Sequence, residues 1–361
     1  MKACMNVEYG SADVVTVGEA PMPEAKADEV LVRVHAASVT TADWRFRASS
    51  FPGGFWLAGR LLLGLFRPRN PILGMDYSGV VAAVGRDVTG FRVGDEVFGA
   101  TTRGAHAEYV AVKASGAIAP KPASLSHEEA AAIPFGANSA LMFMRDFGKV
   151  KPGQRVLVIG ASGGVGSWAV QIARHLGAEV TGACSTRNVE LVRSLGAHHV
   201  VDYSRSRSGS PFGDATYDLV FDTVGVTTFA GTKHALSPKG TYLPLEGSLR
   251  TMAQAVLTAF GSGKKVKHAI SKNTRQGLEE ISRLIEAGVV RPVVDGVYPM
   301  DRIADAYRVV EGRHKRGSVI VTMGLAGNNE PEVTVSTPWH SGSSPAARSS
   351  ASASAAVSLS H

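Results

Sequence analysis

Four glycines at the start of a helix-like segment form the pattern in this chain with the clearest chemistry. The apolar run "RVLVI" gives way to "GVGSWAVQIARHLG" at Gly160, Gly163, Gly164 and Gly166. A Cβ at such a turn would keep the backbone away from a pyrophosphate or block the packing of helix on strand. The free N–H groups at a helix N-terminus also attract phosphate. We therefore predict a dinucleotide site here, the alternative being a structural turn.

The end of the next predicted strand, "EVTGAC", indicates which dinucleotide is bound. A site for NAD(H) usually has Asp or Glu there, which binds both ribose hydroxyls. This chain has Ser185, Thr186 and Arg187 instead. A carboxylate would repel a 2′-phosphate, whereas hydroxyl and guanidinium groups bind it. The sequence therefore predicts NADP(H), the alternative for Arg187 being a solvated residue at a helix start.

The surrounding pattern predicts an α/β fold of two domains. Up to about residue 120, short strand-like runs separated by glycines indicate a β-rich domain. Ser126, followed by acidic residues, is typical of a helix N-cap. From residue 155, strands alternate with helices, which predicts a parallel sheet covered on both faces. The Ser/Ala-rich residues 324–361 have little to bury and are predicted to be a disordered tail.

Composition excludes several classes of protein. The net charge is +7, but Lys and Arg are spread along the chain without a block of five, so we predict no nucleic-acid partner and attribute the charge to a polyanionic cofactor. Two cysteines cannot form a disulfide framework. The N-terminus lacks the apolar core of a secretory signal, which predicts a cytoplasmic protein.

One apolar segment, "FPGGFWLAGRLLLGLFRPRN", needs its own explanation. Its apolar part, residues 51–66, is interrupted by Arg60 and by glycines, and is shorter than the roughly 20 residues that span a bilayer. We predict no stable membrane insertion. The favoured interpretation is a loop or helix that covers a pocket, and the alternative is contact with a membrane surface.

Three stretches resemble the medium-chain dehydrogenase/reductases. They are "PGQRVLVIGASGGVGSWAVQIARHLGAEVTGACSTRN", "LGMDYSGVVAAVGRDVTGFRVGDEVFG" and "GVVRPVVDGVYPMDRIADAYRVVEGRHKRGSVIV". The resemblance covers about residues 1–323 and is nearest to the zinc-free quinone oxidoreductases, also called zeta-crystallin-like. It implies a GroES-like β-rich catalytic domain (1–126 and 264–323), an inserted Rossmann NADP(H)-binding domain (127–263) and a homodimer or homotetramer.

The resemblance also bears on zinc. The position of a zinc-binding Cys in related enzymes falls at Thr40, and their Gly-His-Glu reads Gly74, Met75 and Asp76. Asp43 and Asp76 remain, but two carboxylates without Cys or His make a poor Zn²⁺ site. We therefore predict no metal.

In relatives, the loop that faces the nicotinamide corresponds to catalytic candidates Thr40, Asp43, Trp44 and Arg47. Arg47 would stabilise charge on the acceptor oxygen and Trp44 would stack on an aromatic acceptor. The alternative is a buried Arg47–Asp43 pair with Trp44 in the core. Relatives commonly carry Asn-Pro where this chain has Thr40-Thr41, which leaves the identity of the acceptor open.

The cofactor contacts combine the glycine turn and the strand end with positions that the resemblance implies. Asn138 stands where relatives commonly have Thr, and Tyr203 has an alternative role in packing at a strand end. The predicted set is Asn138, Ala161, Ser162, Gly163, Gly164, Val165, Gly166, Ser185, Thr186, Arg187, Tyr203, Thr223, Val224, Gly225 and Arg313.

The sequence shows no Ser-His-Asp or Cys-His pairing that would indicate nucleophilic catalysis. This fits a reaction in which the cofactor supplies the reactive group. We predict hydride transfer from NADPH to a quinone-like or other electron-poor carbonyl acceptor. One alternative is reduction of an activated C=C bond, although no Tyr in the N-terminal loop is an obvious proton donor. Another is a non-enzymatic NADPH-binding protein that uses the tail or the apolar segment as its contact.

Overall fold

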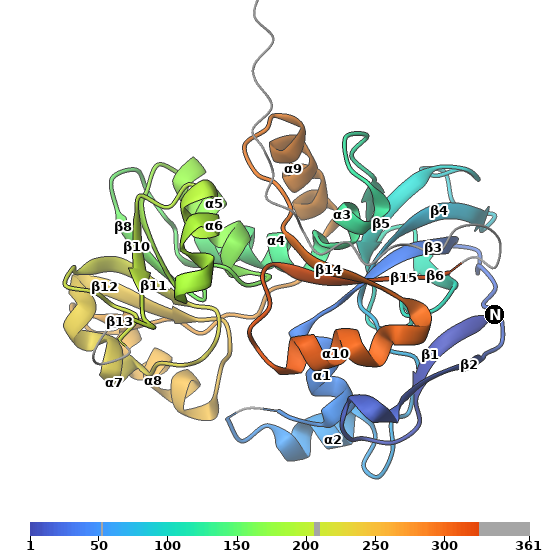
Figure 1. The fold of residues 1–361 in the computed structure, drawn as a ribbon, viewed down its shortest axis with the longest axis horizontal. Helices are drawn as coiled ribbons and strands as arrows, with labels where there is room; N and C mark the ends of the chain where they lie inside the picture. The colour runs from blue at the N-terminus through green and yellow to red at the C-terminus, as the bar shows by residue number, and fades with distance from the viewer. Residues whose placement is uncertain (52, 206–209, 325–361) are drawn as a thin grey trace, which may run out of the picture.

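The computed structural model describes residues 1–51, 53–205 and 210–324, which form two domains (Figure 1). The N-terminal third and the C-terminal end of this range build a β-rich domain, and the middle of the chain builds a domain around a parallel sheet (Figure 1). The predicted α/β fold class is confirmed. The predicted tail, apart from Gly324, lies outside the described residues.

The β-rich domain is built on a sheet in the order β14-β15-β3-β4-β5-β7, with β6 also paired to β3. Its centre is β3, whose sequence EVLVRVHAASV is rich in β-branched residues and mostly buried. A separate hairpin pairs β1 with β2. The strands are β1 (Lys2–Asn6), β2 (Val15–Glu19), β3 (Glu29–Val39), β4 (Asp76–Val84), β5 (Glu96–Ala100), β6 (Tyr109–Lys113), β7 (Ala117–Pro120), β14 (Val294–Pro299) and β15 (Ser318–Thr322).

Three helices belong to this domain, namely α1 (Thr41–Ala48), α2 (Trp56–Leu63) and α10 (Ile303–Glu311). The apolar segment of residues 51–66 therefore contains a short helix, α2. No described helix is long and apolar enough to cross a bilayer.

A run of short helices joins the two domains. Ser126 caps the first of them with its side chain and forms a capping box with Glu129, as its position predicts. Pro134 occupies the first turn of the second, where a missing N–H costs nothing. These helices are α3 (His127–Ala131), α4 (Pro134–Leu141) and the π-helical segment Met142–Phe147.

The second domain has six parallel strands in the order β10-β9-β8-β11-β12-β13. This order reverses between β8 and β11, and ligands of such sheets bind at the carboxyl ends of the strands at that point. The strands are β8 (Arg155–Ile159), β9 (Glu179–Cys184), β10 (His199–Asp202), β11 (Tyr217–Asp222), β12 (Leu236–Pro244) and β13 (Lys265–Val266). The helices of this domain are α5 (Gly166–His175), α6 (Val189–Ser194), α7 (Phe229–Thr232) and α8 (Leu249–Ala259). Helix α9 (Arg275–Glu286) follows the sheet in the chain and packs against β7 and α4.

The parallel sheet continues slightly past the domain boundary that we predicted at residue 263. Strand β13 pairs with β12, with Thr241 opposite Lys265. A two-residue strand carries no periodicity that a sequence pattern could reveal. The chain then returns to the β-rich sheet, because β14 and β15 pair with each other and β15 pairs with β3.

Candidate active site

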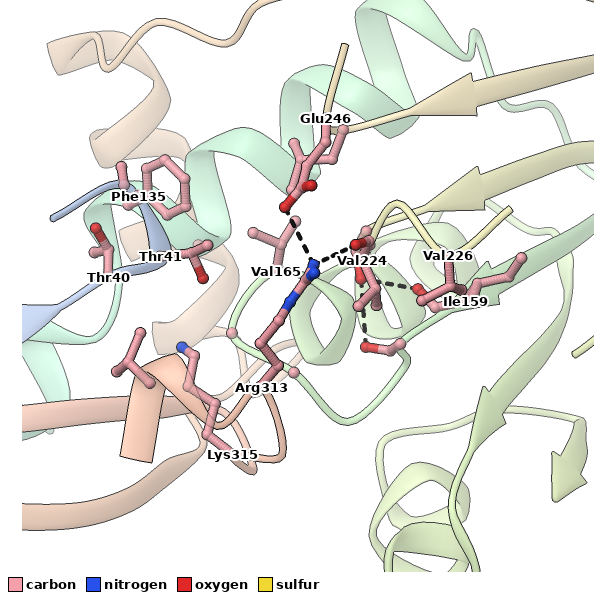
Figure 2. A pocket seen from close by; sticks show the side chains of 18 of the residues that line it. Thr40, Thr41, Phe135, Ile159, Val165, Val224, Val226, Glu246, Arg313 and Lys315 are labelled. Atoms are coloured by element: carbon pink, nitrogen blue, oxygen red, sulfur yellow. Dashed lines mark hydrogen bonds and ion pairs between the residues drawn. The ribbon is translucent and has the colours of Figure 1, made fainter. Parts of the chain in front are cut away.

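A cleft of about 950 Å³ lies between the two domains. Its walls come from the glycine turn after β8, the ends of β9, β11 and β12, the first turns of α1, and the segment between α10 and β15 (Figure 2). We call this last segment, residues 313–317, the return segment. The cleft therefore opens at the carboxyl edge of the parallel sheet, where the strand order predicts a dinucleotide.

The glycine turn has the close approaches that its sequence predicts. Gly160 has a φ of 77°, and a Cβ on Gly166 would lie 2.0 Å from the Gly160 carbonyl oxygen. Of the predicted cofactor residues in this turn, Ser162, Gly163, Gly164 and Val165 line the cleft, whereas Ala161 and Gly166 do not. The bare backbone of the turn fits a pyrophosphate, because side chains at these positions would fill the cradle.

Two of the three residues that we predict to bind a 2′-phosphate lie in the cleft lining at the end of β9, and so does the predicted cofactor contact Tyr203 after β10. Ser185, Arg187 and Tyr203 line the cleft, and Thr186 lies outside its lining. The guanidinium of Arg187 donates to the carbonyl oxygen of His314 in the return segment. Sequence reasoning missed Asn188, whose Nδ2 donates to the Ser162 Oγ at 2.9 Å and ties this strand end to the glycine turn.

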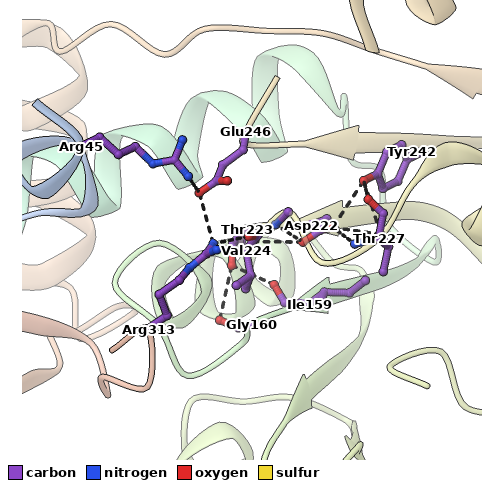
Figure 3. A network of polar contacts seen from close by, with 11 residues as sticks. Arg45, Ile159, Gly160, Asp222, Thr223, Val224, Thr227, Tyr242, Glu246 and Arg313 are labelled. Atoms are coloured by element: carbon purple, nitrogen blue, oxygen red, sulfur yellow. Dashed lines mark hydrogen bonds and ion pairs between the residues drawn. The ribbon is translucent and has the colours of Figure 1, made fainter. Parts of the chain in front are cut away.

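Asp222 holds the loop after β11 in shape, a role that no sequence signal revealed (Figure 3). Its carboxylate is fully buried. It accepts hydrogen bonds from the backbone N–H groups of Val224, Gly225 and Thr227 at 3.0, 2.8 and 3.0 Å. The predicted contacts Thr223 and Val224 line the cleft, and Gly225, with a φ of 72°, makes the turn behind them.

An ion-pair network crosses the cleft (Figure 3). Glu246, just after β12, lies 2.6 Å from a guanidinium nitrogen of Arg45 on α1 and 3.4 Å from Arg313 in the return segment. Arg313 also donates to the Val224 carbonyl oxygen. The predicted residue Arg313 is therefore placed at the cofactor loop, and the network joins the two domains.

Lys315 in the return segment projects into the cleft toward Thr40 and Thr41 (Figure 2). Its Nζ donates to the Gly317 carbonyl oxygen at 3.1 Å, and a Cβ on Gly164 would lie 2.9 Å from it. Burial lowers the pKa of the Lys315 ammonium to about 8, while nearby carboxylates, including that of Asp76, oppose this shift. Lys315 was missed by sequence reasoning.

Asp76 lies in the wall of the same cleft and is 1% exposed. Its Oδ2 accepts from the Ser38 Oγ at 3.1 Å and from the Phe135 N–H at 3.0 Å. Its Oδ1 has no hydrogen-bond partner among the described residues. Burial raises the pKa of this carboxyl to about 8. Asp76 and Lys315 are thus two proton-carrying groups in one cleft with pKa values moved toward neutrality.

Helix α1 presents a different face to the cleft from the one that we predicted. Thr40 lines the cleft and caps the helix, and its Oγ1 donates to the Asp43 Oδ2 at 2.6 Å. Residues three and four apart share a face of a helix. The cleft face consists of Thr41, Ala42, Arg45 and Phe46, and the predicted Asp43, Trp44 and Arg47 lie outside the lining.

Arg47 points into the β-rich domain and is fully buried. It donates to Glu311 on α10 at 2.9 Å, and its guanidinium carbon lies 5.0 Å from the centre of the Tyr307 ring. Trp44 packs against the core of this domain. This placement does not fit contact of Arg47 or Trp44 with an acceptor, and the partner of Arg47 is Glu311 rather than Asp43.

Asn138 is also outside the cleft lining. It is 1% exposed on α4, and its Nδ2 donates to the Lys272 carbonyl oxygen at 2.6 Å. The side chain thus fixes the segment before α9 to α4. Direct contact with a cofactor, which the resemblance implied, is not what this geometry favours.

Part of the cleft lining is aromatic. Five phenylalanines line the cleft, namely Phe46, Phe51, Phe55, Phe135 and Phe143. Within the part of the chain that the structure describes, no three His, Cys, Asp or Glu side chains are grouped so that they could hold a metal ion. The cleft can therefore hold a dinucleotide beside a flat apolar molecule. Lys315 and Asp76 line the same cleft and could transfer protons there.

Comparison with known proteins agrees with this geometry. Residues 26–123 match the model of the alcohol dehydrogenase GroES-like domain, and residues 195–321 match that of a zinc-binding dehydrogenase. The chain is 32% identical to the human mitochondrial NAD(P)H oxidoreductase RTN4IP1, over 82% of each chain. The chain belongs to the medium-chain dehydrogenase/reductases, in their quinone oxidoreductase-like branch.

Two further relatives show the range of this branch. A chloroplastic NADPH-dependent alkenal/one oxidoreductase of Arabidopsis thaliana is 32% identical, over 89% of this chain and 79% of that protein. The structure of the quinone oxidoreductase from Coxiella burnetii superposes with a TM-score of 0.78 and 26% identity, over 89% of this chain and 99% of that one. The protein is thus an oxidoreductase that uses a nicotinamide cofactor and a small-molecule substrate. Its cytoplasmic location and its oligomeric state stay predictions.

Proposed function

We propose that this protein transfers a hydride from NADPH to a quinone-like, electron-poor acceptor without zinc. One observation carries the proposal: the same cleft is lined by the glycine turn and by several phenylalanine side chains. At the positions where zinc-dependent relatives have ligands, the chain offers Thr40, Met75 and Asp76. This donor set lacks the Cys and His that bind zinc. The cofactor, when bound, supplies the hydride.

NADPH rather than NADH is favoured by the charges at the end of β9. Ser185, Arg187 and Tyr203 face the cleft together, and the strand ends without a carboxylate. The Arg187 guanidinium and the Ser185 and Tyr203 hydroxyl groups can bind the 2′-phosphate of NADPH. A carboxylate at this strand end, as in sites for NADH, would repel that phosphate.

The acceptor is positioned by apolar contact and by a proton donor. Phenylalanine rings such as Phe46 and Phe135 favour a flat conjugated molecule through offset stacking. Lys315, protonated below pH about 8, stabilises negative charge that develops on the acceptor oxygen and then donates a proton to it. Asp76 lies in the cleft wall and favours the ammonium form of Lys315.

Reduction of an activated C=C bond is a second candidate, and Lys315 is the observation that favours it. After hydride addition to an enone, the neighbouring carbon must be protonated, which requires a positioned acid. The sequence offered no obvious donor for this step, whereas the structure places the Lys315 ammonium in the cleft. The alkenal/one oxidoreductase among the relatives has this activity in its name.

A panel of acceptors tests both candidates. Oxidation of NADPH and of NADH is followed with quinones, enones, aldehydes and enoyl thioesters, before and after prolonged chelation. We expect the protein to oxidise NADPH with quinones, and we expect prolonged chelation to leave this activity unchanged. Lys315→Met separates the two candidates, because oxygen exchanges protons rapidly with water and carbon does not: enone reduction would fall much further than quinone reduction. Tight NADPH binding without oxidation by any acceptor of this panel would contradict both candidate reactions.

A further inference from the structure

Two helices near the mouth of the cleft expose large apolar side chains to solvent. On and just after α2, the exposed fractions are 51% for Trp56, 73% for Leu62 and 88% for Phe66. On and just after α8, they are 78% for Leu257 and 93% for Phe260. We call these two helices and the residues that follow them, 56–66 and 249–260, the apolar face. Exposed apolar patches of this extent mark contact sites rather than ordinary surface.

The two helices come from different domains but lie next to each other. The N–H of Leu249, at the start of α8, donates to the Gly53 carbonyl oxygen in the turn before α2 at 3.3 Å. Both helices lie along the lower edge of the molecule in Figure 1. Phe55 beside α2 and Met252 on α8 also line the cleft. The apolar face is therefore continuous with the mouth of the cleft.

The two chain segments that carry the apolar face contain charges of one sign. Residues 51–70 and 247–270 contain no Asp or Glu, and seven Lys or Arg, namely Arg60, Arg67, Arg69, Arg250, Lys264, Lys265 and Lys267. None of these seven forms an ion pair within the described residues. Lys264 and Lys267 instead donate to backbone carbonyl oxygens. The partner of this face must therefore supply both apolar surface and negative charge.

A second copy of the chain fits this requirement poorly. In a two-fold symmetric dimer the same patch faces itself, which would bring the unpaired cations of one copy toward those of the other. The surface of an anionic bilayer meets both conditions. Short helices with Trp, Phe and Leu on one side and basic residues around them lie in the interface plane without spanning the membrane.

We propose that the apolar face docks this protein on the surface of an anionic lipid bilayer, with the mouth of the cleft toward the lipid. Docking itself needs neither cofactor nor acceptor. If the proposed function also holds, an apolar acceptor dissolved in the membrane enters the cleft without crossing water.

Vesicle flotation of the full chain, without cofactor or acceptor, tests the docking. We expect the protein to float with vesicles of phosphatidylglycerol and phosphatidylcholine, to release at high salt, and not to float with phosphatidylcholine alone. Binding should shift the fluorescence of Trp56 to shorter wavelength. The wild type remaining unbound on anionic vesicles at low salt would overturn the proposal.

Two variants and a control localise the contact. Leu62→Ser with Phe66→Ser should lower the bound fraction at least about tenfold, because these side chains are the apolar part of the contact. Arg67→Glu with Arg69→Glu should do the same at low salt. Val93→Ser, at an exposed valine in the turn before β5, should bind like the wild type. Equal binding of all variants would overturn the proposal. It would also be overturned if the protein did not bind vesicles and instead formed a concentration-dependent dimer that the Leu62/Phe66 variant abolishes. Because no turnover is measured, these results are independent of the proposed reaction.

Discussion

A carboxylate oxygen of Glu246 lies 2.6 Å from a guanidinium nitrogen of Arg45, and this ion pair joins the two domains across the cleft (Figure 3). Only 14% of the Arg45 side chain and 17% of the Glu246 side chain are exposed. Glu246→Gln should therefore lower the free energy of unfolding by roughly 1–3 kcal/mol, since it leaves Arg45 largely buried without its charged partner. Thermal unfolding checks this.

An exposed ion pair provides the matched control. Arg193 and Glu190 pair within α6, where their side chains are 60% and 84% exposed. Glu190→Gln should change stability by less than about 0.5 kcal/mol, because water solvates both charges. Equal effects of Glu190→Gln and Glu246→Gln would show that the pair across the cleft contributes nothing beyond a surface contact.

Cofactor choice should depend on Arg187. Arg187→Glu places a carboxylate beside Ser185 and Tyr203, where a 2′-phosphate would meet a like charge. The ratio of kcat/KM for NADPH to that for NADH should fall at least about tenfold, because juxtaposed like charges cost several kcal/mol. Arg193→Glu on α6, whose side chain lies outside the cleft lining, should leave the ratio unchanged. An unaltered ratio for Arg187→Glu would mean that this residue is solvated and selects no cofactor.

The cofactor half of the site could be predicted from the sequence because its residues lie close together along the chain. Glycines such as Gly160 and Gly166 are needed where a strand is followed by a helix that binds a pyrophosphate. Ser185 and Arg187 directly follow the next strand. Residue type and spacing along the chain were therefore sufficient to place them. The same holds for Ser126, whose capping box needs only a Glu three residues later.

The catalytic half could not be read in this way. Which side of α1 faces the cleft depends on how the helix packs on α10. The sequence pattern therefore places Arg47 at the acceptor, whereas in the structure it pairs with Glu311. Asp76 and Lys315 are separated by more than two hundred residues and meet only because β15 returns to the sheet beside β3. No local sequence pattern predicts that Asp76 and Lys315 lie in the same cleft.

Arg47 should affect stability rather than catalysis. Glu311→Ala leaves the fully buried Arg47 guanidinium without its carboxylate partner and should cost roughly 1–3 kcal/mol of unfolding free energy, because the Glu311 side chain is itself 40% exposed. Arg47→Met removes the buried charge itself and should cost less, because an apolar side chain of similar length replaces it. Both variants should keep kcat within about twofold of wild type at temperatures where they remain folded. If Arg47→Met instead lowered kcat strongly while its unfolding temperature stayed unchanged, Arg47 would contact the acceptor.

The pH dependence of enone reduction should report Lys315. Burial lowers its pKa to about 8, so the ammonium that donates the proton is present below this pH and is lost as pH rises through it. In the wild type, kcat should therefore decline above pH about 8. Lys315→Arg should retain a proton throughout this range and remove the decline, because a guanidinium does not titrate there.

Asp76 also titrates near this pH, since burial raises its pKa to about 8, and it must be separated from Lys315. Asp76→Asn removes a carboxylate that favours the ammonium form, so the decline should persist and move to lower pH. Lys267→Arg is the control, because burial lowers the pKa of this lysine as well, and its side chain lies outside the cleft lining. It should leave the profile unchanged. A decline that vanished in Asp76→Asn and persisted in Lys315→Arg would make Asp76 the proton donor.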